Sequence, residues 1–551
     1  METSNPSFQT STATLVVRWA FCLAVAMVAL WRLSENTADP DLWGHVLFGQ
    51  RMLDAACVDR TEPFSWTAPG HPWINHEVGA EIVMGAVHRF AGGTGLLLLM
   101  VLAGALTMGL ALKLGTDGLA WPQRAAAWGI AGLLAKEVAF GFAARPQIFT
   151  AIALVLMILL LRRAHSGSQK WLMMMPLLFV VWVNMHGGAV AGICLLGLAA
   201  AATTAQWLWA RRLSFAPAFR SGRTASQRSA PFHGPGMEPT LNPVMLWVAA
   251  TVSAAALLCN PWGCGLLNWL VESVLWLRPE ISEWNPPGFG VDHLPMFALI
   301  PLSILAFATS RRSKAWWEPA VLLALGMASL RLQRHIPLFC IAAIAIVPPH
   351  LADSVDRFKD HLAHLRRILA RTPVKWALSV ALITTAAAAG GATMFHNKRD
   401  FTTMEVPRDE YPVAAADFIR RMGLSGNLLV SFDWGEFAIW ELPDSRVSMD
   451  GRLDTCYPHD LIREHWRFYE GEKVDETVLD ISRADLALIE SFCPGSQVLR
   501  SDPAWKLVYR DPLAAVWVRN PGRFHSLDHL TGPAAPPREL TRGREPFPSR
   551  R

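Results

Sequence analysis

Acidic and histidine side chains gather in one short stretch near the start of the chain. The stretch opens with D-P-D-L-W-G-H, from Asp39 to His45, and closes with W-I-N-H-E, which ends at Glu77. Asp39 and Asp41 flank a proline, which restricts the backbone between them. A D-x-D pair can hold Mg²⁺ or Mn²⁺ through oxygen ligands, or one aspartate can act as a general base without metal. The structural alternative is capping of the helix that follows.

The neighbouring polar residues extend this candidate site. His45 lies four residues after Asp41, one helical turn away, and could orient that carboxylate. Asn75, His76 and Glu77 precede the next predicted helix, where Glu77 could instead simply favour a helix N-terminus. The candidate catalytic residues are Asp39, Asp41, His45, His76 and Glu77, with Asp39 and Asp41 as possible metal ligands.

Cations that could hold a phosphate occur much later in the chain. Arg145 opens R-P-Q, and His186 lies in N-M-H-G-G, where the glycines permit close backbone approach. Arg334 and His335 end the cluster R-L-Q-R-H, which begins at Arg331. Arginine suits oxyanion recognition, whereas contact with lipid headgroups is the structural alternative. The candidate substrate-binding residues are Asn75, Arg145, His186, Arg334 and His335.

Long apolar runs must position these residues. The chain has 551 residues, of which 52% are hydrophobic and only 17% charged, and this composition indicates a multi-span membrane protein. About eleven runs approach the length of a crossing. They lie at 15–33, 95–114, 122–143, 147–161, 171–183, 189–209, 244–258, 294–309, 317–330, 336–347 and 376–393. We expect helices at 41–55 and 77–90 to lie at the membrane surface.

Basic residues favour one orientation of these spans. With the N-terminus in the cytoplasm, Lys- and Arg-rich loops fall on the cytoplasmic side and the motif-like polar clusters on the outer side. We expect a flexible cytoplasmic loop at 215–242 and a basic amphipathic helix at 355–375. Lys136 and Glu137 lie within a span and could pair with each other. The net charge of +5 is small, and we expect no nucleic-acid partner.

Residues 397–520 have the composition of a small soluble α/β domain on the outer side. We predict helices at 412–422 and 461–470, and strands at 427–431, 437–442, 446–449, 486–489, 505–509 and 514–518. The motifs D-W-G at Asp433 and D-G-R at Asp450 are typical of turns and could also line an acceptor groove. Cys456 and Cys493 could pair or remain free thiols. Residues 521–551 are Pro- and Arg-rich and predict a disordered tail.

These motifs resemble those of the GT-C superfamily, integral membrane glycosyltransferases that use polyprenyl-phosphate-linked sugars. The chain is also similar to a group of bacterial membrane proteins that share seven motifs, found here at 39–45, 75–77, 145–147, 184–188, 260–263, 433–435 and 450–452. The resemblance, which reaches about residue 519, implies that Asp39 or Asp41 is the base or metal ligand. The W-W-D-x-G signature of oligosaccharyltransferases is missing, which argues against asparagine glycosylation.

The expected architecture is an all-α, GT-C-like membrane domain at 1–396, with its first outer loop at 34–94, followed by the exoplasmic α/β domain. The expected function is transfer of a sugar, with inversion, from a polyprenyl-phosphate donor to an acceptor at the outer face of the bacterial inner membrane. The acceptor, whether glycan, lipid or protein, and the sugar are not indicated by the residues. The alternative is a non-catalytic transporter or an assembly protein for envelope polysaccharide.

Overall fold

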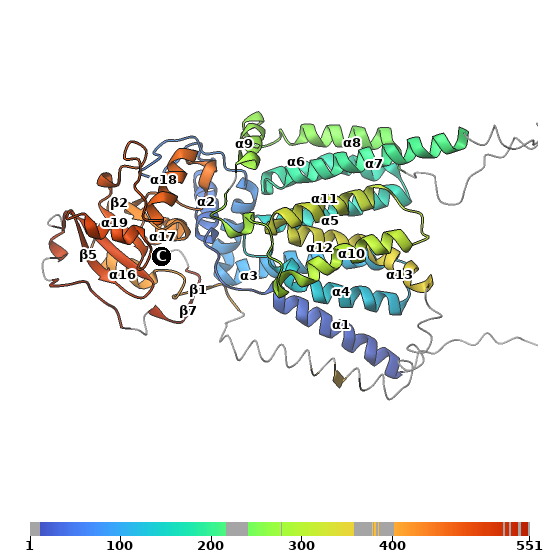
Figure 1. Ribbon diagram of the computed structural model, residues 1–551, viewed down its shortest axis with the longest axis horizontal. Helices are drawn as coiled ribbons and strands as arrows, with labels where there is room; N and C mark the ends of the chain where they lie inside the picture. The colour runs from blue at the N-terminus through green and yellow to red at the C-terminus, as the bar shows by residue number, and fades with distance from the viewer. Residues whose placement is uncertain are drawn as a thin grey trace, which may run out of the picture.

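The computed structural model describes residues 12–215, 241–357 except 277, positions 377, 380, 381 and 384, and 402–548 except 522, 523, 528, 529 and 538–540. A helical bundle forms one part and a mixed α/β domain caps one end of it (Figure 1). The predicted flexible loop at 215–242 and the helix at 355–375 lie mostly outside the described residues. So does the last predicted span at 376–393, apart from four isolated positions.

Each of the other ten predicted apolar runs forms a helix. The bundle helices are α1 (Thr12–Leu33), α3 (Val78–Thr116), α4 (Trp121–Ala139), α5 (Gln147–Ser166), α6 (Met175–Met185), α7 (Ala189–Phe215), α8 (Pro243–Ala256), α10 (Leu294–Thr309), α11 (Trp317–Arg331) and α12 (Ile336–Ile346). All residues of α12 except Leu338 are buried, because α3, α4, α5, α10 and α11 surround it. This explains why α12 is apolar on every face.

Helix length gives fewer crossings than the sequence does. Among the described residues, five helices are long and apolar enough to cross a membrane, or six if one bent pair counts as a single span. Helices such as α6 and α12 have only 11 residues each and are too short by the usual length. The predicted number of about eleven crossings is therefore not confirmed.

The surface helix predicted at 77–90 and the span predicted at 95–114 are two segments of α3. They are separated by Gly92, whose φ of 56° and ψ of −150° are not helical. Only glycine adopts such a conformation readily, so the break depends on this residue. The segment before the break packs on α2 (Leu42–Ala55), and the segment after it enters the bundle.

The α/β domain contains a five-stranded sheet in the order β3-β2-β4-β6-β5. Its strands are β2 (Asn427–Val430), β3 (Arg446–Val447), β4 (Leu486–Glu490), β5 (Trp505–Arg510) and β6 (Ala514–Arg519). β2 is parallel to β3 and β4, whereas β6 is antiparallel to β4 and β5. Its longer helices are α16 (Val413–Arg421), α17 (Gly435–Glu441), α18 (His459–Tyr469) and α19 (Gly495–Ser501).

One secondary-structure prediction in this domain is wrong. Residues 437–442 were expected to be a strand, but they belong mostly to α17. The run F-A-I-W-E-L is short and mostly apolar, and periodicity does not separate a buried strand from a buried helix in such a run. The helical form lets Phe437 pack against Trp43 of α2, with ring centroids 5.5 Å apart.

The first outer loop and the α/β domain share one hydrophobic core. Trp43 is completely buried, and its ring lies 4.5 Å from Tyr411 and 5.3 Å from Phe547. The loop also extends the sheet: the Trp66 N–H donates to the Val447 carbonyl at 3.1 Å, next to a parallel bridge between Ser65 and Val447. The domain is therefore held rigidly against the end of the bundle where the loop lies.

Part of the C-terminal tail is ordered, in contrast to the disorder expected for 521–551. β7 (Arg544–Pro546) pairs with β1 (Glu405–Pro407) in an antiparallel arrangement, and the adjacent Phe547 is buried. Its contact with Trp43 explains the order, because burial of an aromatic ring offsets the entropy lost by the chain. Cys456 and Cys493 are free thiols.

Candidate active site

Charged side chains from distant parts of the sequence meet where the first outer loop reaches the start of α5. Arg145 Nε pairs with Asp39 Oδ1, and Arg145 Nη2 lies 3.2 Å from Asp41 Oδ2. Arg145 Nη1 lies 3.7 Å from Glu283 Oε2. Burial acts to lower the pKa of Arg145, but the three carboxylates raise it well above its ordinary value. The predicted acidic pair and the predicted phosphate-binding arginine are thus in direct contact.

Asp41 stands at the N-cap position of α2 but makes no capping hydrogen bond with its side chain. Its carboxylate faces Arg145, and its backbone N–H donates to Asp39 Oδ1 at 3.1 Å. Burial raises the pKa of Asp41 to about 6, although Arg145 acts in the opposite direction. A carboxylate with this pKa is mostly ionised at neutral pH and basic enough to accept a proton.

Glu77 connects three histidines. Its Oε1 lies 3.4 Å from His76 Nε2 and 3.7 Å from His186 Nε2, and its Oε2 lies 3.8 Å from His45 Nδ1. Burial acts to raise the pKa of Glu77, but His76 and His45 hold it well below its ordinary value. Glu77 is therefore an ionised carboxylate at the centre of this cluster.

His45 faces Glu77 and Glu81 rather than the carboxylate of Asp41 that it was expected to orient. Its Nδ1 lies 3.4 Å from Glu81 Oε1. Burial acts to lower the pKa of His45, but the hydrogen bond with Glu81 and the nearby charge of Glu77 raise it to about 9. Asn75 is buried, donates to Glu81 Oε2 at 2.5 Å and accepts the Glu77 N–H at 2.9 Å. These bonds suit a positioning role, and its predicted substrate contact stays a prediction.

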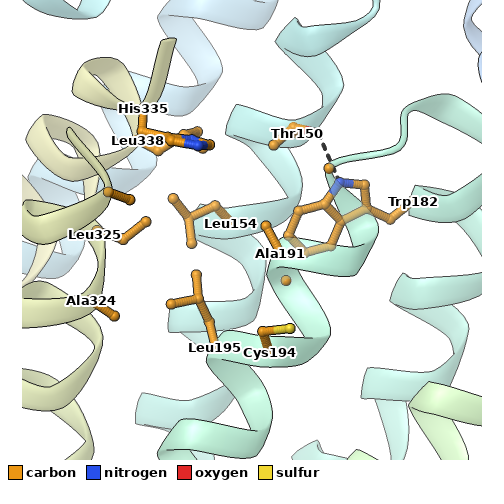
Figure 2. Close-up of a pocket in the computed structure, with 13 residues that line it drawn as sticks. Thr150, Leu154, Trp182, Ala191, Cys194, Leu195, Ala324, Leu325, His335 and Leu338 are labelled. Carbon is orange, nitrogen blue, oxygen red and sulfur yellow. Dashed lines mark hydrogen bonds between the residues drawn. The ribbon is translucent and has the colours of Figure 1, made fainter. Parts of the chain in front are cut away.

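His186 ends α6 and lies within reach of α5. Its Nδ1 accepts the Gly188 N–H at 3.0 Å and lies 2.9 Å from Thr150 Oγ1. Thr150 Oγ1 in turn accepts the Trp182 indole N–H at 2.9 Å (Figure 2). Because Nδ1 accepts, the proton of the neutral ring stands on Nε2, on the side of Glu77. Burial lowers the pKa of His186 to about 3, so the ring is neutral.

Arg334 and Arg145 share Glu283. Arg334 Nη1 lies 3.8 Å from Glu283 Oε1, and its guanidinium stacks 4.3 Å from the centroid of the Trp284 ring. Glu283 and Trp284 both belong to the short helix η4 (Ser282–Trp284). The loop after α9 (Cys264–Leu275), which contains this helix, therefore brings an acid between the two arginines. His335, the next residue, lies apart from these carboxylates and lines an apolar cavity instead.

That cavity has a volume of about 190 Å³ and lies between α5, α7, α11 and α12. Leucine and alanine side chains from these helices point into it, and His335 lies at one end (Figure 2). Thr150 and Gly188, which contact His186, also line it. The cavity therefore lies next to His186, at the edge of the charged cluster.

Lys136 and Glu137 do not pair with each other, so that prediction is wrong. Lys136 Nζ lies 2.8 Å from Asp292 Oδ1, and Glu137 Oε2 lies 3.0 Å from His293 Nδ1. Adjacent residues of a helix point in different directions, which explains the separate partners. Both pairs tie α4 to the start of α10.

The D-G-R motif holds the first outer loop to the α/β domain. Arg452 donates to Asp450 Oδ1 and Oδ2 at 2.8 and 2.7 Å, and its Nη1 lies 2.5 Å from Glu62 Oε2. Arg452 also stacks on Trp73 at 4.6 Å. Burial acts to raise the pKa of Asp450, but Arg452 lowers it below its ordinary value. The motif is therefore an internal clamp as well as a turn.

Sequence reasoning missed three acids of the site: Glu81, Glu283 and Glu436. Glu81 stands one helical turn after Glu77, a spacing that could have indicated it. Glu283 lies in a polar cluster, E-W-N-P-P, that carried no predicted role. Glu436 follows D-W-G and is buried against α2, where its Oε2 accepts the Gly44 N–H at 3.0 Å. The sequence carries no signal for that last contact.

Two groups among the described residues have ligand atoms within 4.8 Å of one another: His76, Glu77 and His186, and His45, Glu77 and Glu81. Histidine with carboxylate suits a transition metal more than Mg²⁺. The Gly188 N–H bond places the ring proton of His186 on Nε2, however, so that nitrogen has no free lone pair for a metal. Asp39 and Asp41, the predicted Mg²⁺ or Mn²⁺ ligands, share Arg145 instead, and their metal role stays a prediction.

Comparison with solved structures finds two proteins with a similar fold, an ArnT and an oligosaccharyltransferase. ArnT from Cupriavidus metallidurans in the apo state matches with a TM-score of 0.51 and 13% identity, over 92% of this chain and 98% of that chain. The oligosaccharyltransferase of Archaeoglobus fulgidus, tethered with an acceptor peptide, matches with a TM-score of 0.50 and 11% identity, over 86% of this chain and 69% of that chain.

The same ArnT bound to undecaprenyl phosphate gives a TM-score of 0.46 at 12% identity, over 92% of this chain and 98% of that chain. No protein-family model and no curated protein sequence matches the chain. The expected GT-C resemblance is confirmed at the level of the fold, and the apolar helices agree with a multi-pass membrane protein.

Proposed function

We propose that the protein transfers a sugar from a polyprenyl-phosphate donor to an acceptor at the outer face of the bacterial inner membrane. One observation carries this proposal: Asp39 and Asp41 meet Arg145, and through Glu283 also Arg334, beside an apolar cavity. The shared GT-C fold supports the same reaction class. ArnT, one of the proteins with this fold, has been solved with undecaprenyl phosphate.

In the proposed step the acceptor hydroxyl attacks the anomeric carbon while the bond from that carbon to the donor phosphate breaks, which inverts the configuration. The hydroxyl proton passes to Asp41, whose pKa of about 6 suits a base. Arg145 and Arg334 stabilise the negative charge of the departing polyprenyl phosphate. A phosphate that draws Arg145 away from Asp41 also leaves this carboxylate more basic.

The remaining predicted residues take supporting roles. Glu77 pairs with His76 and His186, and His186 contacts Thr150 and Gly188 of the cavity lining, so an acceptor hydroxyl or the sugar can be held beside these side chains. The cavity is smaller than the ~300–1,000 Å³ typical of drug-sized ligands, so it suits a short part of a prenyl chain next to the phosphate. His335 lies at the end of this cavity.

We further propose that the N-terminus is cytoplasmic, that about eleven segments cross the membrane, and that the α/β domain is exoplasmic. The helix ends far from the site carry pairs of basic residues, Arg162–Arg163, Arg211–Arg212 and Arg311–Arg312, in agreement with the tendency of such residues to face the cytoplasm. Reporter fusions after α5 and within the α/β domain test this orientation. Two signals from the same side of the membrane would contradict it.

Mass spectrometry of lipid-linked sugars and envelope glycans tests the proposed function. Cells that lack the protein should accumulate one polyprenyl-phosphate sugar and lose that sugar from one envelope component. Expression of the wild-type chain should reverse both changes, and the Asp41→Asn variant should not. Unchanged lipid-linked sugars in the deleted strain would contradict the proposal.

A non-catalytic transporter or assembly protein for envelope polysaccharide is the second candidate. The observation in its favour is that Arg145 and Arg334 are already paired with acids of the same chain. A transporter is expected to place its polar groups near mid-membrane, whereas these lie at the ends of α5 and α12. Full complementation by Asp39→Asn and Asp41→Asn variants would favour the assembly role.

A further inference from the structure

Glu283 stands between the two arginines of the candidate site. Its Oε2 lies 3.7 Å from Arg145 Nη1, and its Oε1 lies 3.8 Å from Arg334 Nη1, so each guanidinium faces a different oxygen of one carboxylate. Arginine holds carboxylate and phosphate oxygens with the same N–H groups. A phosphate bound by both arginines must therefore take the position that Glu283 occupies.

The contacts of Glu283 are loose. Both distances exceed the roughly 2.7–3.2 Å of an N–H···O hydrogen bond, and no hydrogen bond to the Glu283 carboxylate is formed within the described part of the chain. Asp39, by contrast, accepts hydrogen bonds from Arg145 and from the Asp41 backbone. The Glu283 side chain is 24% exposed, and a partly exposed carboxylate in long ion pairs is held weakly. Another anion can therefore replace it.

The backbone around Glu283 is fixed. The Asn285 carbonyl accepts the Gln333 N–H at 3.1 Å, and the Ser282 carbonyl accepts a hydrogen bond from Gln333 Nε2 at 3.2 Å. Gln333 directly precedes Arg334, so these bonds tie η4 to the segment that carries this arginine. Rotation of the Glu283 side chain can therefore free Arg334 without a movement of the loop.

The position of Arg334 does not depend on Glu283 alone. Its guanidinium lies 4.3 Å from the centroid of the Trp284 ring, and the guanidinium of Arg278 lies 4.3 Å from the same ring. Arg278 is buried, and its Nη2 donates to Asp454 Oδ1 of the α/β domain at 2.8 Å. Arg334 is therefore supported by Trp284 and stays in place when the carboxylate leaves.

The proposed reaction increases the negative charge of the phosphate. Before transfer the phosphate is a diester with a single negative charge, and the bond between its oxygen and the anomeric carbon then breaks. The departing polyprenyl phosphate is a monoester with a charge of about −1.5 to −2 at pH 7. Two arginines alone would hold this product more tightly than the donor, because the attraction grows with charge. An anion that competes for the same arginines counteracts this difference.

We propose that Glu283 competes with the lipid phosphate for Arg145 and Arg334 and thereby promotes release of the polyprenyl phosphate product. The carboxylate leaves the arginines when the donor binds and returns to them after transfer. This role rests on the proposed transfer reaction and concerns turnover, not the chemical step. It also gives a reason for the pairing of Arg334 with an acid of the same chain.

Binding of undecaprenyl phosphate to the purified protein in detergent tests the competition without turnover. Glu283→Gln removes the charge and keeps the shape of the side chain, so it should bind undecaprenyl phosphate about tenfold more tightly than the wild type. Glu280→Gln, which changes an exposed glutamate of the same loop, should bind like the wild type. Equal or weaker binding by Glu283→Gln would show that Glu283 supports the arginines and would overturn the proposal.

Undecaprenol, which has the same prenyl chain without the phosphate, separates this proposal from the proposed function. If wild type and variants bind undecaprenyl phosphate no more tightly than undecaprenol, phosphate binding by the two arginines is contradicted, and with it the proposed function. Binding that depends on the phosphate but is equal in wild type and Glu283→Gln contradicts only the role of Glu283. If Glu283→Gln does not fold, Glu283→Asp takes its place. Its shorter side chain draws the carboxylate away from the arginines, so it should bind about threefold more tightly than the wild type.

Kinetics in proteoliposomes test the effect on product release. In Glu283→Gln the inhibition constant of added undecaprenyl phosphate should fall about tenfold, while KM for the donor should fall only about threefold, because the donor phosphate carries the smaller charge. A purely structural defect would not lower the inhibition constant more than KM. Equal changes in the two constants, or no change in either, contradict the role in release.

Discussion

Two buried charge clusters stand at opposite ends of the same helix bundle and differ in their balance. At the far end, Glu318 pairs with Arg162 at 3.1 Å and with His350 at 3.2 Å, and Arg162 also donates to the Leu114 carbonyl at 2.6 Å. At the candidate site, Arg145 faces three carboxylates and shares one of them, Glu283, with Arg334. The far cluster matches one acid with two basic groups, whereas the site has more acids than strong cations.

The surroundings of the two clusters differ as well. Residues that contact His186 line the apolar cavity of about 190 Å³. A second hollow, lined by Val347, Pro348 and Leu351 next to His350 of the far cluster, has a volume of only about 10 Å³. A balanced cluster without a hollow of ligand size joins helices, whereas an unbalanced one beside such a hollow has capacity for a ligand and a proton. The comparison explains why burial of charge alone does not identify an active site.

Loss of the central cation should have the largest effect. Arg145→Gln leaves Asp39 and Asp41 without neutralisation and Glu283 with Arg334 alone, so transfer should fall at least about a hundredfold and stability by about 3 kcal/mol. Activity assays in proteoliposomes and thermal unfolding measure the two effects. Arg331→Gln, at an exposed arginine of the same region, is the control and should change neither. If Arg145→Gln and Arg331→Gln had equal effects on transfer and stability, the special role of Arg145 in the candidate site would be contradicted.

Arg334→Lys should have a smaller effect that falls on donor binding. Lysine keeps the charge but loses the planar stacking on Trp284, so KM for the donor should rise about tenfold with little change in kcat. Initial rates at varied donor concentration separate the two constants. A variant with unchanged KM would place the donor phosphate away from Arg334.

Gly44→Ala tests the contact between α2 and the α/β domain. The added methyl group would meet the Glu436 carboxyl, and we expect a loss of about 1–3 kcal/mol in stability together with reduced transfer. Gly109→Ala, in α3 where nothing lies within 4 Å of the new carbon, is the matched control and should be neutral or slightly stabilising. Equal unfolding temperatures for the two variants would contradict close approach at Gly44.

Glu318→Gln should leave transfer unchanged and lower stability only. The substitution removes the acid between Arg162 and His350, and loss of one partner of a buried pair costs about 3 kcal/mol. Unfolding and transfer assays on the same preparation check that stability falls while transfer stays unchanged. A tenfold loss of kcat at native stability would show that the far cluster also takes part in the reaction.

The sequence predicted the parts of this molecule that depend on local pattern. Apolar runs gave the bundle helices, because a buried stripe or an all-apolar run has few other stable forms in a membrane. The strands β2, β4, β5 and β6 followed from short apolar runs between turn residues. The surface segment and the span of α3 were also separated correctly, because polar residues end near Gly92.

Contacts between distant segments were only partly predictable. Asp39, Asp41 and Arg145 could be named from residue type and position, but their direct pairing needed the fold. The contact of Glu436 with Gly44 carries no local signal, because it depends on how the α/β domain packs on α2. The same packing turned residues 437–442 into a helix and ordered the strand β7.

Turnover of a synthetic polyprenyl-phosphate sugar by the purified protein in proteoliposomes, with Asp41→Asn measured beside the wild type, tests the central claim most directly. The convergence of Asp41 with Arg145 predicts transfer by the wild type and a loss of at least about a hundredfold in kcat for Asp41→Asn, with donor affinity retained. Equal kcat for a folded Asp41→Asn variant would contradict it.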